Sequence, residues 1–245
     1  GALDLLPQES MGPPVAAMLL RWPAECPASA QRERCRLVSY AAIMHGCSLL
    51  SALPAVAQEM AQRLGAADAQ VSEEILRTVG NLARYALSAQ CAPQSLVELV
   101  GPLLEPDVHR GGAAGAGALA SRAVQRALAE APLELLRPAA VLPVLHRILA
   151  LFSSRDGATA EALGLLGSAV ELVAQELPEV DVHFVMQHAV AAAHVAHEPQ
   201  RRQGLELLRR MAPLLRQRAS GSGGAPPEAY AGQILAWMAD ELRLV

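Results

Sequence analysis

Lysine is absent from this chain of 245 residues, so arginine supplies all 20 of its basic side chains. Asparagine occurs only at Asn81. Because the codons for lysine and asparagine are rich in A and T, we attribute both shortages to a GC-rich gene and not to selection for guanidinium groups. The net charge of −4 excludes a generally basic nucleic-acid binder, although a local basic patch is compatible with it.

Strand-forming residues are also scarce. Aromatic residues make up only 3% of the chain, and valine is the only abundant β-branched residue, whereas the dominant alanine and leucine favour helix. No run of about 18 residues is free of charged, proline or polar interruptions, so no membrane span is expected. At 52% hydrophobic and 18% charged residues, the chain is too apolar for disorder and has ample material for a core.

The four cysteines, Cys26, Cys35, Cys47 and Cys91, form no CxxC pair and are irregularly spaced. This pattern fits neither a zinc ligand set nor a dense disulfide framework. We expect reduced structural thiols, because Cys35 and Cys47 lie in or beside apolar helical runs. A single disulfide between Cys26 and Cys35 is the alternative.

Apolar residues recur every three or four positions along most of the chain, a spacing typical of amphipathic helices. In the segment 71–88, Val71, Ile75 and Val79 belong to one apolar stripe, and Ser72 with the two acids after it is the expected start signal. The pattern predicts helices over 32–46, 49–64, 71–88, 93–104, 114–131, 138–152, 159–176, 181–197, 201–218 and 227–243.

Proline and glycine divide the chain into two parts. Residues 1–31 contain five prolines and are expected to form an extended N-terminal segment with one short helix near 15–21. Residues 32–244 are expected to form a single helical-repeat domain. The glycine-rich stretches near 111–117 and 220–224 are expected to be flexible loops within it.

A loose internal period indicates how the helices are arranged. Helix pairs begin near residues 32, 71, 114 and 181, so the first steps are about 38 to 43 residues, which is typical of two helices and two turns per repeat. We therefore predict an all-α fold, a right-handed α-solenoid-like stack of antiparallel helix pairs. An irregular helical bundle is the alternative.

Four segments resemble one another: RLVSYAAIMHGC (36–47), EEILRTVGNLARYAL (73–87), DVHFVMQHAVAAAHVAHEP (181–199) and PPEAYAGQILAWMADELRL (226–244). In each, small residues lie near the centre of an apolar helix. The pattern resembles the repeats of the organellar octotricopeptide and FAST-kinase-like families, whose members belong to mitochondrial and chloroplast RNA metabolism. It is also similar to HEAT and armadillo arrays, which are protein-binding scaffolds. No nuclease-like domain or base-reading residue pair is matched.

The helix expected over 201–218 has the sharpest charge pattern of the chain. It contains six arginines and the single acid Glu206, a local charge of +5. Arg202, Arg209 and Arg216 are seven residues apart and share one helix face, where guanidinium groups are suited to bind phosphates or carboxylates. A solvated face opposite the leucine stripe is the alternative. The candidate partner-binding arginines are Arg201, Arg202, Arg209, Arg210 and Arg216.

Residues 156–200, just before this helix, contain seven acidic residues and no arginine. The simplest expectation is that neighbouring repeats present opposite charges to each other. Four histidines lie within 181–197, of which His194 and His197 are three residues apart. Because no third ligand follows at helical spacing, we expect no metal site and interpret these histidines as residues at a helix or subunit contact.

No catalytic motif is present in the sequence. GxSxG, Walker A and HExxH patterns are missing, and the GGAAGAGA string at 111–118 has no lysine and follows no strand. We therefore predict a protein that is not an enzyme, with no cofactor and no small-molecule substrate.

Trp22 and Trp237 are the only tryptophans. Trp237 is expected in the core, whereas Trp22, in the proline-rich segment, is a candidate partner-binding residue if it does not pack in the core. Taken with the repeats, these features predict a scaffold or accessory subunit of a larger protein assembly. Its expected location is mitochondrial or otherwise organellar, and cytoplasmic if not. An RNA-binding repeat protein of an organellar ribonucleoprotein is the alternative.

Overall fold

The computed structural model describes residues 26–64, 68–88, 90–110, 115–152 and 159–220. Throughout these ranges the regular structure is helical. The elements are α2 (Ala28–His45), η3 (Gly46–Ala52), α3 (Leu53–Leu64), α4 (Ala69–Asn81), η4 (Leu82–Ala86), α5 (Gln94–Val100), η5 (Gly101–Leu104), α6 (Pro106–Arg110), α7 (Ala116–Glu130), α8 (Pro138–Phe152), α9 (Ala160–Val173), α10 (Glu179–Ala193) and α11 (Glu198–Ser220).

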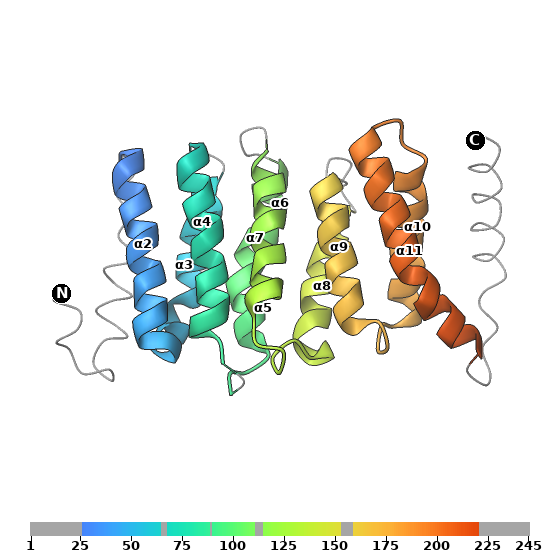
Figure 1. Ribbon diagram of the computed structural model, residues 1–245, viewed down its shortest axis with the longest axis horizontal. Coiled ribbons are helices and arrows are strands. Elements are labelled where there is room, and N and C mark those ends of the chain that lie inside the picture. The colour runs from blue at the N-terminus through green and yellow to red at the C-terminus, as the bar shows by residue number, and fades with distance from the viewer. Residues whose placement is uncertain (1–25, 65–67, 89, 111–114, 153–158, 221–245) are drawn as a thin grey trace.

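The helices form two layers, which we call the first and second layers (Figure 1). The first layer holds α2, α4, α7, α9 and α11, and each of them packs against the next. The second layer holds α3, α5, α8 and α10, and each of these helices also contacts the next one along the stack. Because the chain crosses between the layers at each short loop, successive helices form stacked pairs. The predicted all-α helical-repeat fold is confirmed.

Polar contacts between neighbouring helices show the repeat length directly. Ser39 of α2 donates a hydrogen bond to Thr78 of α4, and Arg210 of α11 donates to Glu171 of α9; both pairs are 39 residues apart in the sequence. Other contacts between repeats join residues 35 to 46 positions apart. This spacing agrees with the step of about 38 to 43 residues expected from the sequence.

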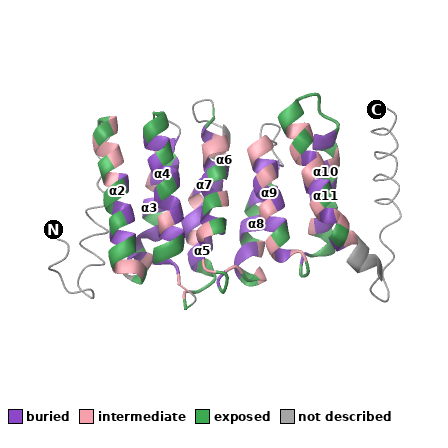
Figure 2. Ribbon diagram, viewed as in Figure 1, coloured by how far each residue is buried: buried purple, intermediate pink, exposed green. Residues whose placement is uncertain are grey.

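The apolar stripes of the helices face inward and form one continuous core between the layers (Figure 2). In α4 the expected stripe is confirmed, because Val71, Ile75 and Val79 are completely buried. Repeats of this kind cover their apolar faces only with neighbouring repeats. The largest fully buried side chains are Leu53, Met60, Ile75, Leu82, Leu96, Leu99, Leu103, Leu145, Ile148, Leu151 and Leu163.

The boundaries of α4 differ from those expected. Asp68, and not Ser72, is the N-cap: its Oδ1 accepts a hydrogen bond from the Val71 amide at 2.8 Å, which satisfies a free N–H group of the first turn. Ser72 is buried within the helix. After Asn81 the helix widens into the π-helical turn η4, so the last turns of the expected helix are not α-helical.

Other expected helices between 32 and 218 are present with small shifts at their ends. The short helix α6 was not expected from the sequence. Pro54 lies in the first turn of α3 and marks its late start, whereas Pro143 and Pro213 lie inside α8 and α11. The expected helix 227–243 and the predicted loop at 220–224 lie outside the described residues, apart from Ser220, which ends α11.

Candidate partner-binding groove

A groove of about 900 Å³ opens on the first layer between α9 and α11, with one contribution from α7. It therefore spans three consecutive repeats. Its lining is mostly polar and charged, and consists of Gln125, Ala160, Glu161, Gly164, Ser168, Glu198, Pro199, Arg202, Gln203, Leu205, Glu206, Arg209 and Arg210.

Two side-chain amides lie close to the same glycine in this groove. A Cβ atom built on Gly164 of α9 would lie 3.2 Å from Gln125 Nε2 of α7 and 3.3 Å from Gln203 Oε1 of α11. The absence of a side chain at Gly164 thus leaves room for both amides. Neither amide has a hydrogen-bond partner within the described part of the chain.

The arginines of α11 are largely occupied by carboxylates. Arg209 donates two hydrogen bonds to Glu206, both 2.8 Å long, and Arg210 donates to the same carboxylate at 3.0 Å. Arg210 also reaches across to α9 and pairs with Glu171 at 2.9 Å. The hydrogen bonds from Arg209 and Arg210 lower the pKa of Glu206 to about 2.

Arg201 pairs with Glu198, at 2.7 Å, in the first turn of the same helix. Arg202 is different: it is exposed, it lines the groove, and no residue that the structure describes forms an ion pair or hydrogen bond with it. Glu161, on the facing helix α9, is likewise unpaired within the described ranges. The groove thus offers one positive and one negative group that are available to a ligand.

The structure places part of the expected arginine stripe at the groove. Arg202, Arg209 and Arg210 do line one groove, but Arg209 and Arg210 are held by carboxylates of the chain itself and are not open cations. Arg201 lies beside the groove in its own ion pair. Arg216 belongs to α11, but its side chain, like all of Trp22, lies outside the described residues.

Several groove residues had not been predicted from the sequence, namely Gln125, Glu161, Gly164 and Gln203. They come from three helices and have no local motif that marks them. The expectation that neighbouring repeats present opposite charges to each other is met by the Arg210–Glu171 pair, which joins the acidic segment to the basic helix. Exposed pairs of this kind contribute little to stability, about 0–1 kcal/mol each.

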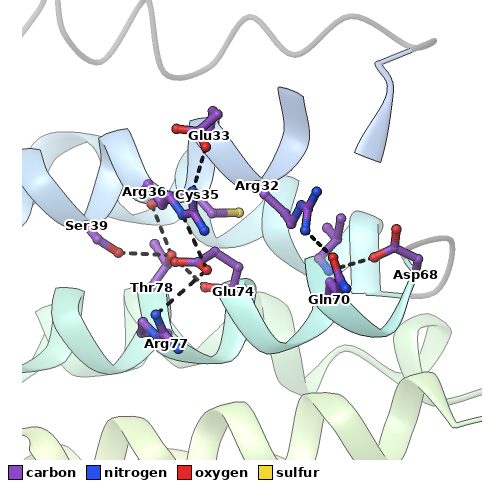
Figure 3. A network of polar contacts seen from close by, with 11 residues as sticks. Arg32, Glu33, Cys35, Arg36, Ser39, Asp68, Gln70, Glu74, Arg77 and Thr78 are labelled. Atoms are coloured by element: carbon purple, nitrogen blue, oxygen red, sulfur yellow. Dashed lines mark hydrogen bonds and ion pairs between the residues drawn. The ribbon is translucent and has the colours of Figure 1, made fainter. Parts of the chain in front are cut away.

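A second polar cluster lies between α2 and α4 (Figure 3). Ser39 Oγ donates to Thr78 Oγ1 at 3.0 Å, and Thr78 Oγ1 lies 3.1 Å from the carbonyl oxygen of Cys35. The Glu74 carboxylate lies 3.7 Å from the guanidinium group of Arg36. Burial, together with the nearby charge of Glu74, raises the pKa of the Cys35 thiol to about 12. A thiol of this kind is protonated at neutral pH and is not an activated nucleophile, so we interpret the cluster as an inter-repeat contact.

All four cysteines are free, so the alternative of a Cys26–Cys35 disulfide is not what the structure contains. Within the described ranges, no three His, Cys, Asp or Glu side chains are grouped as metal ligands would be. No helix of the described part combines the length and the apolar character needed to cross a membrane.

The outer face of α2 is apolar and exposed over Leu37, Tyr40, Ile43 and Met44. In the described part of the first layer, α2 has a neighbour, α4, on only one side. This face was not singled out from the sequence, because an exposed apolar residue cannot be distinguished by periodicity from one that packs in the core.

His188 of α10 lies between two phenylalanine rings. Its ring centroid is 5.1 Å from that of Phe152 and 4.9 Å from that of Phe184, and its Nε2 is buried without a hydrogen-bond partner within the described residues. Burial lowers the pKa of His188 below its ordinary value of 6.5. The expectation of a histidine at a helix contact is met at this position.

This burial makes stability depend on pH. The unfolded chain binds a proton on His188 more readily than the folded chain does. The free energy of unfolding should therefore lose nothing to this histidine above pH 6.5, and it should decrease as the pH falls below that value. In His188→Phe we expect a smaller loss of stability between pH 7.5 and pH 5, measured by urea unfolding. His109, whose pKa is also lowered by burial, keeps a residual slope in both proteins. An unchanged pH dependence in the variant would contradict this assignment.

No protein-family model matches the chain. No curated protein matches it either.

Among solved structures, the chain is similar to a designed armadillo repeat protein in complex with the peptide (KR)4, with 15% identity, a TM-score of 0.41, and coverage of 91% of this chain and 98% of that one. Two engineered proteins are similar at 14% and 12% identity, with TM-scores of 0.39 and 0.43, over 92% and 91% of this chain and 97% of each of theirs. We assign the helical-repeat fold from the packing of the chain's own helices.

Proposed function

We propose that this protein is a non-catalytic helical-repeat scaffold, an accessory subunit that binds a protein partner of a larger assembly through the groove between α9 and α11. The observation that carries the proposal is the groove itself. It has a volume of about 900 Å³ and is lined from three repeats, with an arginine, a glutamate and two amides that lack partners among the described residues.

The architecture supports a binding role for this surface. Repeat proteins bury their apolar faces in contacts between neighbouring repeats. The outward faces of the stacked helices therefore form extended surfaces on which partners can bind. Around the groove, α7 packs directly against α9, and α9 packs against α11. A side chain on α7 thus keeps a defined position relative to side chains on α9 and α11.

The groove favours a protein partner over RNA. Of the arginines on α11 whose side chains the structure describes, Arg201, Arg209 and Arg210 are paired with carboxylates, and Glu161 adds a negative charge to the lining. Its described lining includes no aromatic side chain on which bases stack. RNA binding stays a prediction, which a search for co-purified RNA tests. A location in mitochondria or another organelle also stays a prediction, which cell fractionation tests.

A steric block tests the proposed function. Ser168 lines the groove, and its Oγ donates a hydrogen bond to the Gly164 carbonyl of its own helix, so Ser168→Trp fills the groove without removing a described hydrogen bond between helices. Gln187→Trp, at an exposed position of α10 in the second layer, is the matched control. Native purification followed by mass spectrometry should recover the partner with the wild type and the control and lose it with Ser168→Trp. If the partner is retained by Ser168→Trp, the groove is not its binding site.

A further inference from the structure

We infer that the groove binds an extended peptide segment of the partner, with Arg202 pairing with a carboxylate of that segment and the amides of Gln125 and Gln203 bonding to its backbone. This inference rests on the proposed function and adds the chemistry of the ligand. It assigns different tasks to the charged and the amide groups, which separate variants can test.

The availability of Arg202 follows from the pairing of its neighbours. In a helix, an arginine is within reach of acids four residues before or after it. Glu198 and Glu206 occupy these two positions, but Glu198 is bound by Arg201. Glu206 is bound by other arginines of the same helix through both of its oxygens. Arg202 is therefore left to pair with a group that the described chain does not provide.

The charges in the groove favour a ligand that has a carboxylate for Arg202 and also carries a positive charge. A guanidinium group binds a carboxylate with two parallel hydrogen bonds. Glu161, on the opposite wall, carries the other unpaired charge of the described lining, so a strongly acidic ligand would meet repulsion there. A segment with one acidic and one basic side chain matches both walls.

The two amides specify an extended backbone. Each amide has donors and an acceptor, and both lie close to Gly164, which has no side chain of its own. An extended chain presents free N–H and C=O groups to such amides, whereas a helix has already paired most of its own. The ligand is therefore an extended segment and not a docked helix.

Selection from a phage-displayed library of random decapeptides tests this inference. The wild type should enrich peptides with Asp or Glu at one position, and Arg202→Glu should enrich peptides with Lys or Arg at that same position. Peptides selected by the wild type should bind Arg202→Glu at least about tenfold more weakly, and peptides selected by Arg202→Glu should bind the wild type at least about tenfold more weakly. Arg137→Glu makes the same charge change at an exposed site outside the groove, and should select the same peptides as the wild type.

The double variant Gln125→Ala/Gln203→Ala tests the backbone contacts separately. Added to the wild type, it should weaken the binding of the acidic peptides by about tenfold, and added to Arg202→Glu, it should weaken the binding of the basic peptides by about tenfold. The charge that each protein prefers should not change.

Three results would overturn the inference: no enrichment by the wild type, the same peptides selected by wild type and Arg202→Glu, or unchanged affinities in the double alanine variant. These are distinct from a failure of the proposed function. If Ser168→Trp loses the partner while Arg202→Glu keeps both the partner and the peptides, the groove is the binding site but its ligand chemistry is different.

Discussion

Replacing Gly204 with leucine is expected to lower the free energy of unfolding by about 3 kcal/mol, because α10 and α11 touch at this residue. A Cβ atom on Gly204 would lie 2.7 Å from the backbone nitrogen of Ala193, 2.8 Å from the carbonyl oxygen of Ala189 and 2.9 Å from Ala192 Cβ. Two of these neighbours are backbone atoms, which cannot rotate out of the way. Any larger side chain must push the two helices apart.

Gly167→Ala shows the effect of adding a side chain to a helix glycine that has room for it. Gly167 lies inside α9, and a Cβ atom there would be 3.5 Å from the flexible side chain of Arg210, an ordinary contact distance. Because alanine is the better helix former, this change should stabilise the protein by about 0.5–1 kcal/mol. Urea unfolding followed by circular dichroism measures both variants. A Gly204→Leu protein as stable as the wild type would show that α10 and α11 are not packed as described.

Leu145→Ala should destabilise the protein by about 2–5 kcal/mol. Leu145 of α8 is fully buried in the core, and α8 packs against α5, α9 and α10. The change removes apolar contacts and leaves a cavity that its rigid neighbours fill only in part. Thermal and urea unfolding provide the measurement.

The same substitution at an exposed leucine provides the control. Leu133, in the loop between α7 and α8, is 81% exposed, so Leu133→Ala should change stability by no more than about 0.5 kcal/mol. Equal effects at the two positions would contradict the burial of Leu145 in the core between the layers.

Helix positions were predictable because periodicity is repeated over many residues and the core enforces it. In α4 the buried stripe of Val71, Ile75 and Val79 was predicted correctly. The helix start was not, because Asp68 and Ser72 are both good capping residues, and the choice depends on which of them the core buries. The π-helical turn η4 has no simple sequence signal.

The groove was only partly predictable for a related reason. Charge density along one helix singled out Arg202 and its neighbours. The pairing of Arg210 with Glu171 joins residues 39 positions apart, so only the stacking of repeats reveals it. Gln125, Gly164 and Gln203 are ordinary residues in the sequence and become a site only where three helices meet.

Photo-crosslinking at the groove rim tests the central claim most directly. A photoreactive amino acid replaces Pro199, which is exposed at the rim, and in a second protein it replaces Gln187 of the second layer. The groove account predicts crosslinks from position 199 to one continuous segment of the partner, and none from position 187. Crosslinks from position 187 with none from position 199 would contradict it.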